Sequence, residues 1–275
     1  MNTIQIMGER IRNALASTEI YNAVTADFKD TFLCTGLSVE ESTALALKVL
    51  TLLGQDRDLG DIEAEINTIF TEISIRQVLN DKVSKRSDVI YGQIQRYLGD
   101  IKGKIVDYGT GDGKIAQLIH DKSGLNIEGY DVVIYPAKGV TVPMHTYNGK
   151  HVPVEDNRFD TGLLINVIHH EAQNEQILEE ISRIVSRKLI IIETVPVGMS
   201  ESELKTDHER TFMNDYLYNR LFHYGDNVPV PGTYETPKGW EDRFSRYGWK
   251  VVESINLGVD QEVIKDTHHL LILEK

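Results

Sequence analysis

A run of three closely spaced glycines constrains the fold of this chain more than any other feature of its sequence. Residues 105–116 read IVDYGTGDGKIA, with Gly109, Gly111 and Gly113 between a short apolar run and a helical pattern. A strand that turns into a helix at this place would aim backbone N–H groups and the positive end of the helix at a ligand. Because glycine has no Cβ, the ligand can lie directly against the main chain. The stretch therefore predicts an α/β domain with a cofactor at this strand-to-helix turn.

The pattern after residue 103 predicts a mostly parallel sheet. From Lys104 onward, short β-rich runs alternate with helical patterns, as they do in βαβ units. We expect seven strands, at 104–108, 127–133, near 140–144, 161–167, 188–194, 249–256 and 268–274. The segment between the last two strands is too short for a helical crossover, so these strands should pair antiparallel as a hairpin.

The first hundred residues contain helical patterns and no strand signal of comparable strength. One helix is predicted to start at a capping box that begins with Ser38 and to stop at Gly54. We therefore divide the chain into a helical region at 1–100 and an α/β domain at 101–275, with a cap insertion at about 197–236. The helical region is expected to act either as a lid over the substrate or as a homodimer interface.

Two further helices are expected in the helical region. Apolar residues recur at helical spacing over residues 61–79. A second pattern of this kind begins at Ser87, which we interpret as its N-cap, and ends at Gly99.

The charge of the chain narrows the classes of partner. The formal net charge is −13 over 275 residues, and no cluster of lysine and arginine longer than the KR pair at 85–86 offsets it. Such a field repels polyanions, so nucleic acids and anionic membranes are disfavoured. Cys34 is the single cysteine, and no run of about 18 apolar residues occurs. We therefore expect a cytoplasmic protein in a reducing compartment.

The glycine spacing argues against a dinucleotide cofactor. Nucleotide-dependent dehydrogenases use the spacing G-x-G-x-x-G/A, whereas this chain has G-x-G-x-G with Lys114 where a third small residue would be needed. Asp107 lies in the strand before the glycines, where a carboxylate would repel a pyrophosphate and attract a cationic amino group. A cofactor with an ammonium group fits this pattern better than one with a pyrophosphate.

Four segments, in order along the chain, resemble the class I S-adenosylmethionine-dependent methyltransferases. VDYGTGDG at 106–113 resembles motif I of that family. IEGYDVV at 127–133 ends a second strand with an acid, and YNGKHVPVEDNRFDTGLLINVIHH at 147–170 is similar to the family segment that follows. ILEEISRIVSRKLIIIETV at 177–195 resembles the next helix and strand. The resemblance covers roughly residues 87–275 and implies a Rossmann-like, seven-stranded methyltransferase sheet, mostly parallel with an antiparallel last strand.

The resemblance implies S-adenosylmethionine as the cofactor. This molecule carries a sulfonium, an ammonium and a carboxylate, so its site should combine acids with bare backbone amides. Asp131 stands where the family places the acid that binds the ribose hydroxyls, and Asn148 stands where an aspartate often accepts a bond from the adenine amino group. An amide oxygen can still accept that bond. The cofactor-binding residues implied by the resemblance are Asp107, Gly109, Gly111, Gly113, Asp131, Asn148, Gly149 and Asn166.

Two sets of polar residues are candidates for the substrate side. His169 and His170 follow the fourth predicted strand, at the sheet edge where the methyl group would point. Imidazole titrates near neutral pH, so either ring could remove a proton from the acceptor or serve only to position it. Asp215, Asn219 and His223 recur every fourth residue in the cap insertion, which predicts a polar line on one helical face. That line is either solvated or turned inward toward a substrate, and the catalytic candidates are His169, His170, His223 and Asp215.

These patterns predict an enzyme that transfers a methyl group from S-adenosylmethionine to a small-molecule or carrier-bound metabolite, of the kind found in secondary metabolism. The accepting atom is left open between oxygen, nitrogen and carbon. One alternative is a metal-dependent C-methyltransferase in which His170 and His223 hold an ion that chelates a keto acid or malonyl-type substrate. A metal is not part of the main prediction. The other alternative is a methyltransferase-like protein that binds its ligand without turnover.

Overall fold

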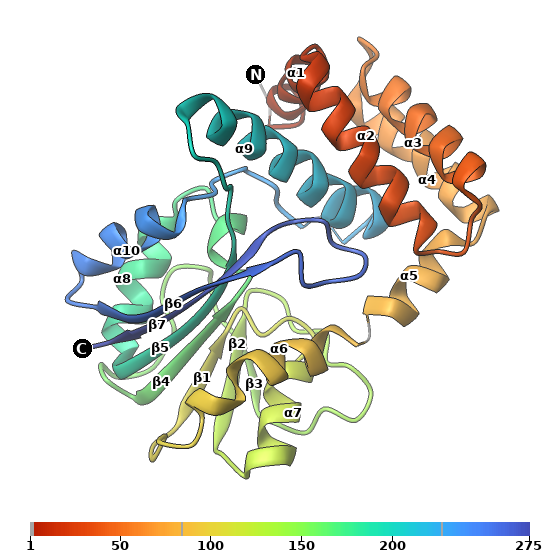
Figure 1. The fold of residues 1–275 in the computed structure, drawn as a ribbon. Helices are drawn as coiled ribbons and strands as arrows, with labels where there is room; N and C mark the ends of the chain where they lie inside the picture. Colours follow the sequence, from red (N-terminus) through yellow and green to blue (C-terminus); the bar gives the residue numbers. More distant parts are fainter. Residues whose placement is uncertain (1–2, 84, 227) are drawn as a thin grey trace. The chain divides into compact units, whose positions relative to one another are not determined.

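A computed structural model of the chain describes residues 3–83, 85–226 and 228–275 (Figure 1). The chain forms two compact units, and each unit combines three stretches of sequence. The first, here called the helical unit, comprises Met1–Ser84, Pro196–Val230 and Val259–Thr267. The second, here called the sheet unit, comprises Lys85–Val195, Pro231–Gly258 and His268–Lys275. The unit boundary after residue 84 lies earlier than the predicted division at 100, and the segment predicted as a cap insertion falls mostly in the helical unit.

The sheet unit contains a seven-stranded sheet with the strand order β3-β2-β1-β4-β5-β7-β6. The strands are β1 (Ile105–Tyr108), β2 (Ile127–Asp131), β3 (Met144–Thr146), β4 (Phe159–Ile165), β5 (Val185–Thr194), β6 (Lys250–Gly258) and β7 (His268–Glu274). Strands β1 to β5 pair in parallel, and β7 runs antiparallel to both β5 and β6. This topology confirms the predicted Rossmann-like methyltransferase sheet and the predicted hairpin.

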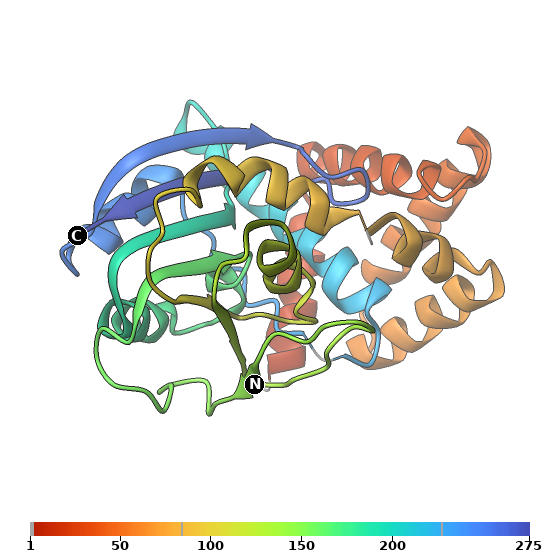
Figure 2. The same cartoon turned by 90° about the horizontal axis from the view of Figure 1, so that it is seen from below.

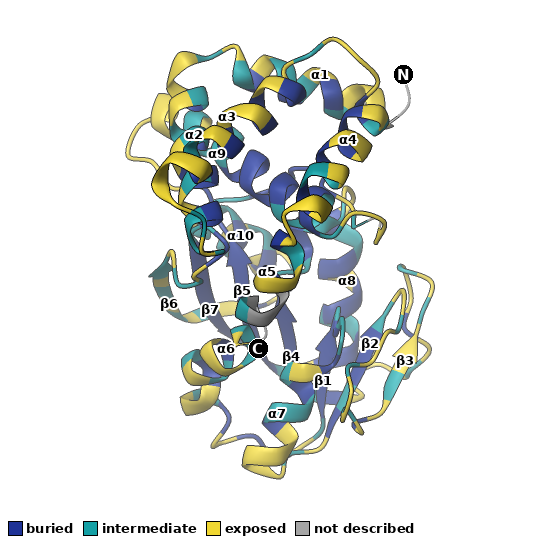
Figure 3. Cartoon of the chain, turned by 90° about the vertical axis from the view of Figure 1, so that its right-hand side faces the viewer, coloured by how far each residue is buried: buried dark blue, intermediate teal, exposed yellow. Residues whose placement is uncertain are grey.

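Helices cover both faces of this sheet (Figures 1 and 2). They are α6 (Arg86–Ile94), α7 (Lys114–Ser123), α8 (Asn174–Ile184) and α10 (Pro237–Ser245), with short turns η1 (Gln95–Tyr97) and η2 (Ile168–His170). One apolar core joins α6 and α7 to the sheet, and a second core on the opposite face joins α8 and α10 to it. Buried residues therefore run along the central strands (Figure 3), which explains why β4 and β5 are rich in leucine and isoleucine instead of alternating with polar residues.

The helical unit is built from α1 (Thr3–Leu15), α2 (Thr18–Leu33), α3 (Val39–Leu53), α4 (Leu59–Glu72), α5 (Ile75–Val83), α9 (Glu201–Tyr216) and the π-helix η3 (Leu217–Phe222). An aromatic cluster lies in its core. The ring centroid of Phe222 is 6.2 Å from that of Phe32 and 5.3 Å from that of Phe70. Thr31 Oγ1 donates to Val263 O at 3.1 Å, which ties the segment between β6 and β7 to α2. Among the described residues, no helix combines the length and apolar character needed to cross a membrane.

Local sequence signals explain several element boundaries. The capping box at the start of α3 is present, because Glu41 N donates to Ser38 Oγ at 3.1 Å and Ser38 N donates to Glu41 Oε2 at 2.9 Å. Gly54 caps the end of α3, as predicted. Ser87 is not an N-cap, because α6 already begins at Arg86 and has no side-chain cap.

Two further element predictions are corrected. The helix expected over 61–79 is divided between α4 and α5, because Ser74 adopts a positive φ of 53° that a helix cannot include. The strand expected near 140–144 begins only at Met144. Gln117 Oε1 accepts bonds from Thr141 N at 2.6 Å and Val142 N at 3.0 Å, and these two N–H groups would otherwise be available to a strand partner.

Candidate active site

The three glycines of the turn between β1 and α7 are required for different reasons. Gly109, Gly111 and Gly113 have φ values of 75°, 55° and 77°, which residues other than glycine rarely adopt. A Cβ on Gly109 or Gly113 would lie within 2.7 Å of a neighbouring side chain. Packing inside the sheet unit therefore excludes a side chain at both positions. A Cβ on Gly111 would meet no atom nearer than Tyr135 Oη, at 3.5 Å. Gly111 is therefore the position where the backbone leaves room for a ligand.

Asp131 joins the end of β2 to this turn. Its Oδ2 accepts a bond from Gly111 N at 2.7 Å, and its Oδ1 accepts one from Val132 N at 2.7 Å. The residue is half-buried. The cofactor prediction requires an acid beside bare backbone, and Asp131 and Gly111 are hydrogen-bonded neighbours.

Asp107 is buried in β1, just before the turn, and accepts a bond from Thr110 Oγ1 at 2.8 Å. Burial raises the pKa of Asp107 to about 6; the bond from Thr110 opposes this shift, and the negative charges of Asp131 and Asp112 add to it. A cation close to the carboxylate would relieve this penalty, which suits the ammonium group of the expected cofactor. With the open backbone at Gly111 and the acid at Asp131, the residues of the turn fit S-adenosylmethionine.

Asn148 takes part in a local turn after β3. Its Oδ1 accepts bonds from Lys150 N at 3.0 Å and from His151 N at 2.8 Å. Gly149 has a φ of 77°, and a Cβ there would lie 3.4 Å from Val132 Cγ1, so this turn lies beside the segment that follows Asp131. The predicted bond from an adenine amino group would compete with two backbone bonds for the same oxygen.

Asn166 shapes the end of β4. It has a φ of 54°, a conformation that asparagine tolerates better than most residues. Its backbone N–H donates to Ile192 O at 2.7 Å. With the side-chain amide turned so that its nitrogen faces the same carbonyl, 3.2 Å away, the amide oxygen is placed to accept a bond from Arg86. Asn166 therefore holds the turn after β4 in place, and its contact with the cofactor stays a prediction.

His169 and Glu193 form a buried pair at the carboxyl ends of β4 and β5. His169 Nδ1 lies 2.5 Å from Glu193 Oε2, and the side chains are 3% and 1% exposed. Glu193 Oε1 accepts bonds from Val167 N at 2.9 Å and Ile168 N at 2.8 Å. Burial opposes ionisation of Glu193, but the His169 ring and the two N–H groups outweigh it, so the pKa of Glu193 lies below its usual value. The carboxylate is therefore ionised.

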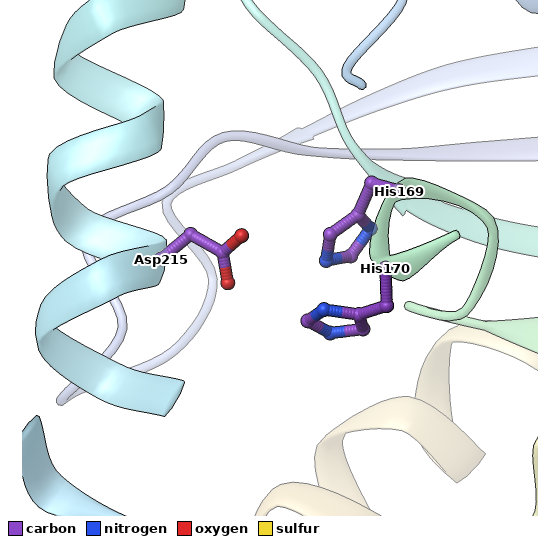
Figure 4. Close-up of side chains that lie close together, drawn as sticks. All are labelled: His169, His170 and Asp215. Atoms are coloured by element: carbon purple, nitrogen blue, oxygen red, sulfur yellow. The ribbon is translucent and has the colours of Figure 1, made fainter. Parts of the chain in front are cut away.

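Other groups of the sheet unit fix the surroundings of His169. The rings of His169 and His170 lie side by side with centroids 4.1 Å apart (Figure 4), and the ring of Tyr234 lies 5.6 Å from that of His169. Thr233 Oγ1 donates to His169 O at 3.0 Å and to Glu171 O at 3.1 Å. The chain before α10 thereby holds the turn that presents both histidines.

Asp215 and His223 belong to the helical unit. Asp215, near the end of α9, is buried and accepts a bond from Asn219 Nδ2 at 2.5 Å; its carboxylate projects from the helix in Figure 4. His223 follows the π-helix η3, and its Nδ1 lies 3.3 Å from Asp226 Oδ2. The predicted polar line is present for Asp215 and Asn219, which are hydrogen-bonded to each other, and the place of His223 on that line stays a prediction.

Sequence reasoning missed two residues of this site. Glu193 ends the apolar run LIIIE, and a lone acid in a strand buried on both faces was a usable signal, because a buried charge needs a partner. Thr110 gave no comparable signal. Its side chain fills the space over Gly129, where a Cβ would lie 2.7 Å from Thr110 Oγ1.

Comparison with known proteins gives a family match and several similar solved structures. A family model described as a methyltransferase domain matches residues 83–254. Similar solved structures include the cyclase SpnF (12% identity, 70% of this chain and 80% of that one, TM-score 0.49). An S-adenosylmethionine-dependent methyltransferase from Mesorhizobium loti has 12% identity over 68% of this chain and 98% of its own, with a TM-score of 0.49. Magnesium protoporphyrin IX methyltransferase from Synechocystis PCC 6803, with bound SAH, has 10% identity over 74% and 87%, with a TM-score of 0.47. No curated protein matches the chain.

Proposed function

Because this chain belongs to the class I S-adenosylmethionine-dependent methyltransferases, we propose that it methylates a small-molecule or carrier-bound metabolite. It is an enzyme, and S-adenosylmethionine is its methyl donor. The observation that carries the proposed acceptor class is the buried His169–Glu193 pair, which belongs to the same unit as the cofactor turn. A buried imidazole suits a small acceptor or the tip of a flexible carrier arm, and the net charge of −13 disfavours a nucleic acid.

Three groups of the sheet unit are proposed to hold the cofactor. The bare backbone at Gly111 lets it lie against the main chain, Asp131 accepts bonds from the ribose hydroxyls, and Asp107 attracts the ammonium group. When bound, S-adenosylmethionine supplies an electrophilic methyl group on its sulfonium. The protein's own contribution is to orient the acceptor in line with that methyl group and to exclude water.

His169 is proposed to take the proton that the acceptor loses. A positioned general base contributes roughly 10²- to 10⁴-fold to the rate of such a step. The negative charge of Glu193, 2.5 Å from the ring, stabilises the imidazolium that forms. His170 lies against the same ring and is half-buried, and we assign it to orienting the acceptor.

Metal-dependent transfer to carbon is the second candidate. Histidines that bind metals commonly donate their other ring N–H to a carboxylate, and His169 has this partner in Glu193. A divalent ion held by the histidines would acidify the carbon of a keto acid or malonyl-type substrate. The two candidates share the cofactor site and differ in what holds the acceptor.

The test of the proposed function measures release of S-adenosylhomocysteine. The purified chain is supplied with S-adenosylmethionine and with separate pools of phenols, amines, hydroxy acids, keto acids and malonyl thioesters. We expect turnover with at least one small-molecule pool and none with DNA, RNA or folded protein. Turnover that requires a macromolecule contradicts the proposal. Calorimetric titration of the same sample with S-adenosylhomocysteine checks that the cofactor site is intact.

Metal dependence is tested on the active pool. The protein is treated with a chelator, desalted and assayed again. Unchanged turnover supports proton removal by His169 alone. Loss of turnover that one divalent ion restores supports the second candidate.

A further inference from the structure

We propose that the guanidinium of Arg86 binds a carboxylate group at the candidate active site. This inference rests on the proposed function and adds a ligand contact to it. The carboxylate belongs either to the cofactor or to an acid among the proposed acceptors, and the experiment below separates the two. Arg86 is part of the KR pair at 85–86, which has no role in the cofactor motifs.

Arg86 lies at the edge of the sheet where the glycine turn begins. It is the first residue of α6 and reaches Asn166, which directly follows β4. In the orientation that satisfies both of its polar atoms, the Asn166 amide accepts a bond from the guanidinium. The next residue, Val167, has its Cγ2 2.5 Å from the place where a Cβ on Gly109 would be. Because ligands of open α/β sheets bind at the carboxyl ends of the strands, Arg86 is beside the place expected for cofactor and acceptor.

The charge of Arg86 is not neutralised by any residue that the structure describes. Among those residues, none hydrogen-bonds its buried Nε and no carboxylate forms an ion pair with it. Arg183 and Arg187, in the same unit, pair with Asp156 at 2.9 Å and with Asp160 at 2.8 Å. The net charge of −13 makes acids plentiful in this chain, so the exception is informative. A partly buried cation without an anion costs free energy, and a bound carboxylate would remove that cost.

The start of α6 adds to the positive potential at this place. Helix N-termini are positive and usually carry acids or residues that cap the N–H groups. α6 instead begins with Lys85 and Arg86, and no described side chain caps it. Asp88, the acid of its first turn, lies 3.4 Å from Lys122. The local potential therefore favours an anionic ligand, and the guanidinium offers the donors.

The shape and charge of the site favour a carboxylate over a phosphate. A guanidinium presents a planar fork of donors that matches the two oxygens of a carboxylate. A phosphate fits the same fork, but Asp107 and Asp131 at the neighbouring turn would repel its second charge. S-adenosylmethionine carries a carboxylate on its amino-acid end, and so do the hydroxy acids and keto acids of the proposed acceptor class.

Arg86→Gln is the test, and Arg158→Gln is its matched control. Arg158 directly precedes β4, at the opposite end of the strand from Asn166. Its side chain is 40% exposed and lies 3.6 Å from Glu128. Both substitutions remove one positive charge from the sheet unit. Titration calorimetry gives the Kd of each variant for S-adenosylhomocysteine and for the analogue of it that lacks only the carboxylate.

The two sources of the carboxylate give different results. If the cofactor supplies it, Arg86→Gln should weaken binding of S-adenosylhomocysteine about tenfold or more and leave the Kd of the analogue within about twofold. If the acceptor supplies it, binding of S-adenosylhomocysteine should stay as in the wild type. The KM for the acid acceptor should then rise about tenfold or more, and the KM for its methyl ester should not change. Arg86→Lys keeps the charge without the fork and should recover part of the loss in either case.

Stability separates this role from a structural one. Because the charge of Arg86 is not neutralised in the ligand-free protein, Arg86→Gln should unfold at the wild-type temperature or above it. A variant that fails to fold overturns the proposal, and so does a folded variant with the wild-type Kd for S-adenosylhomocysteine and no rise in KM for an acid acceptor. Arg158→Gln should match the wild type in every assay, and an equal loss in both variants would reduce the effect to net charge and overturn the specific contact. A wild-type protein that does not bind S-adenosylhomocysteine contradicts the proposed function itself, so the two failures are distinguishable.

Discussion

Gly111 differs from the other two glycines of the turn, Gly109 and Gly113, in what an added methyl group would meet. Its backbone conformation, with a φ of 55°, disfavours any side chain, and the space where a Cβ would point holds no atom nearer than 3.5 Å. Gly124, at the end of α7, has a similar φ of 68°, and a Cβ there would meet no atom within 4 Å. The two positions share the same conformational strain, and only Gly111 adjoins Asp131.

This pair allows a direct test of the cofactor site. Alanine at either position should lower the free energy of unfolding by about 1–2 kcal/mol, because both adopt the left-handed conformation. Gly111→Ala should also weaken binding of S-adenosylhomocysteine about tenfold or more, since the methyl group occupies the ligand's space. Gly124→Ala should bind as the wild type does. Titration calorimetry and thermal unfolding of both variants give the comparison, and equal binding by the two would exclude Gly111 from the site.

Asp107 predicts a pH dependence of stability. Burial raises its pKa to about 6 in the folded protein, above the usual 3.8 of the unfolded chain. The folded state therefore holds the proton more tightly, and stability falls as pH rises from about 4 to about 6. Two pKa units correspond to about 3 kcal/mol.

The variant Asp107→Asn should remove this dependence. Its oxygen can still accept the bond from Thr110, but the side chain has no proton to lose. We expect its free energy of unfolding, relative to the wild type, to rise by roughly 2 kcal/mol between pH 4.5 and pH 7. Denaturant titrations at both pH values measure this difference. A constant difference would mean that Asp107 is ionised at both pH values.

Elements with a local signal were predictable from the sequence. The capping box at Ser38 predicted the start of α3 correctly. The alternation of β-rich and helical runs was enough to predict a mostly parallel sheet. Ser87 was misassigned because a serine in the first turn of a helix and one at its N-cap look alike in sequence. The break at Ser74 and the π-helix after Tyr216 depend on how α4, α5 and α9 pack, which single-sequence periodicity does not contain.

The residues of the candidate site also fall into those that the sequence predicts and those that only the structure reveals. The glycine turn and Asp131 follow from a motif, whereas the role of Glu193 depends on the parallel pairing of β4 and β5, which brings the ends of two strands together. His169 was predicted, but its partner lies 24 residues further along the chain. Such a pair becomes visible only when strand order and register are known.

At the scale of helices, α4 and η3 are joined by a buried ion pair. Glu63 Oε2 lies 2.8 Å from Arg220 Nη2, with side chains 6% and 19% exposed, and Tyr216 Oη donates to Glu63 at 2.7 Å. Glu63→Leu should lower the free energy of unfolding by about 3 kcal/mol or more, because it leaves a buried guanidinium without its anion. The double variant with Arg220→Leu should recover most of this loss, since no buried charge is then unpaired.

Thermal unfolding of the single and double variants measures this coupling. Glu65→Ala is the control on the same helix, because Glu65 pairs with Arg57 at 2.9 Å while both side chains are 44% exposed. That substitution should cost less than about 1 kcal/mol. A double variant no more stable than Glu63→Leu would show that the charge of Arg220 is tolerated without a partner.

At the scale of the whole chain, the helical unit is discontinuous in sequence. It combines Met1–Ser84 with Pro196–Val230 and Val259–Thr267, so the chain passes between the units several times. The segment with α9 and η3 has its partners in the first stretch. Arg210 binds Asp27 through Nε at 2.5 Å and Nη2 at 2.8 Å, and the ring of Phe222 packs against that of Phe70. The N-terminal helices are therefore not an appendage that can be removed without consequence.

Deletion of residues 1–84 tests this conclusion. The fragment 85–275 keeps α9 and η3 but lacks the surfaces that bury Phe222 and pair with Arg210, so it should bind a hydrophobic dye and aggregate on heating. A second fragment, in which residues 196–230 are also replaced by a glycine–serine linker, should be more soluble, because it no longer exposes the apolar side chains of that segment, such as Phe222. Every residue of the cofactor turn is in the sheet unit, so the second fragment should still bind S-adenosylhomocysteine measurably. Light scattering and calorimetry compare the two. A fragment 85–275 that unfolds as cooperatively as the full chain would contradict the assignment of α9 to the helical unit, because its apolar face would then be covered without residues 1–84.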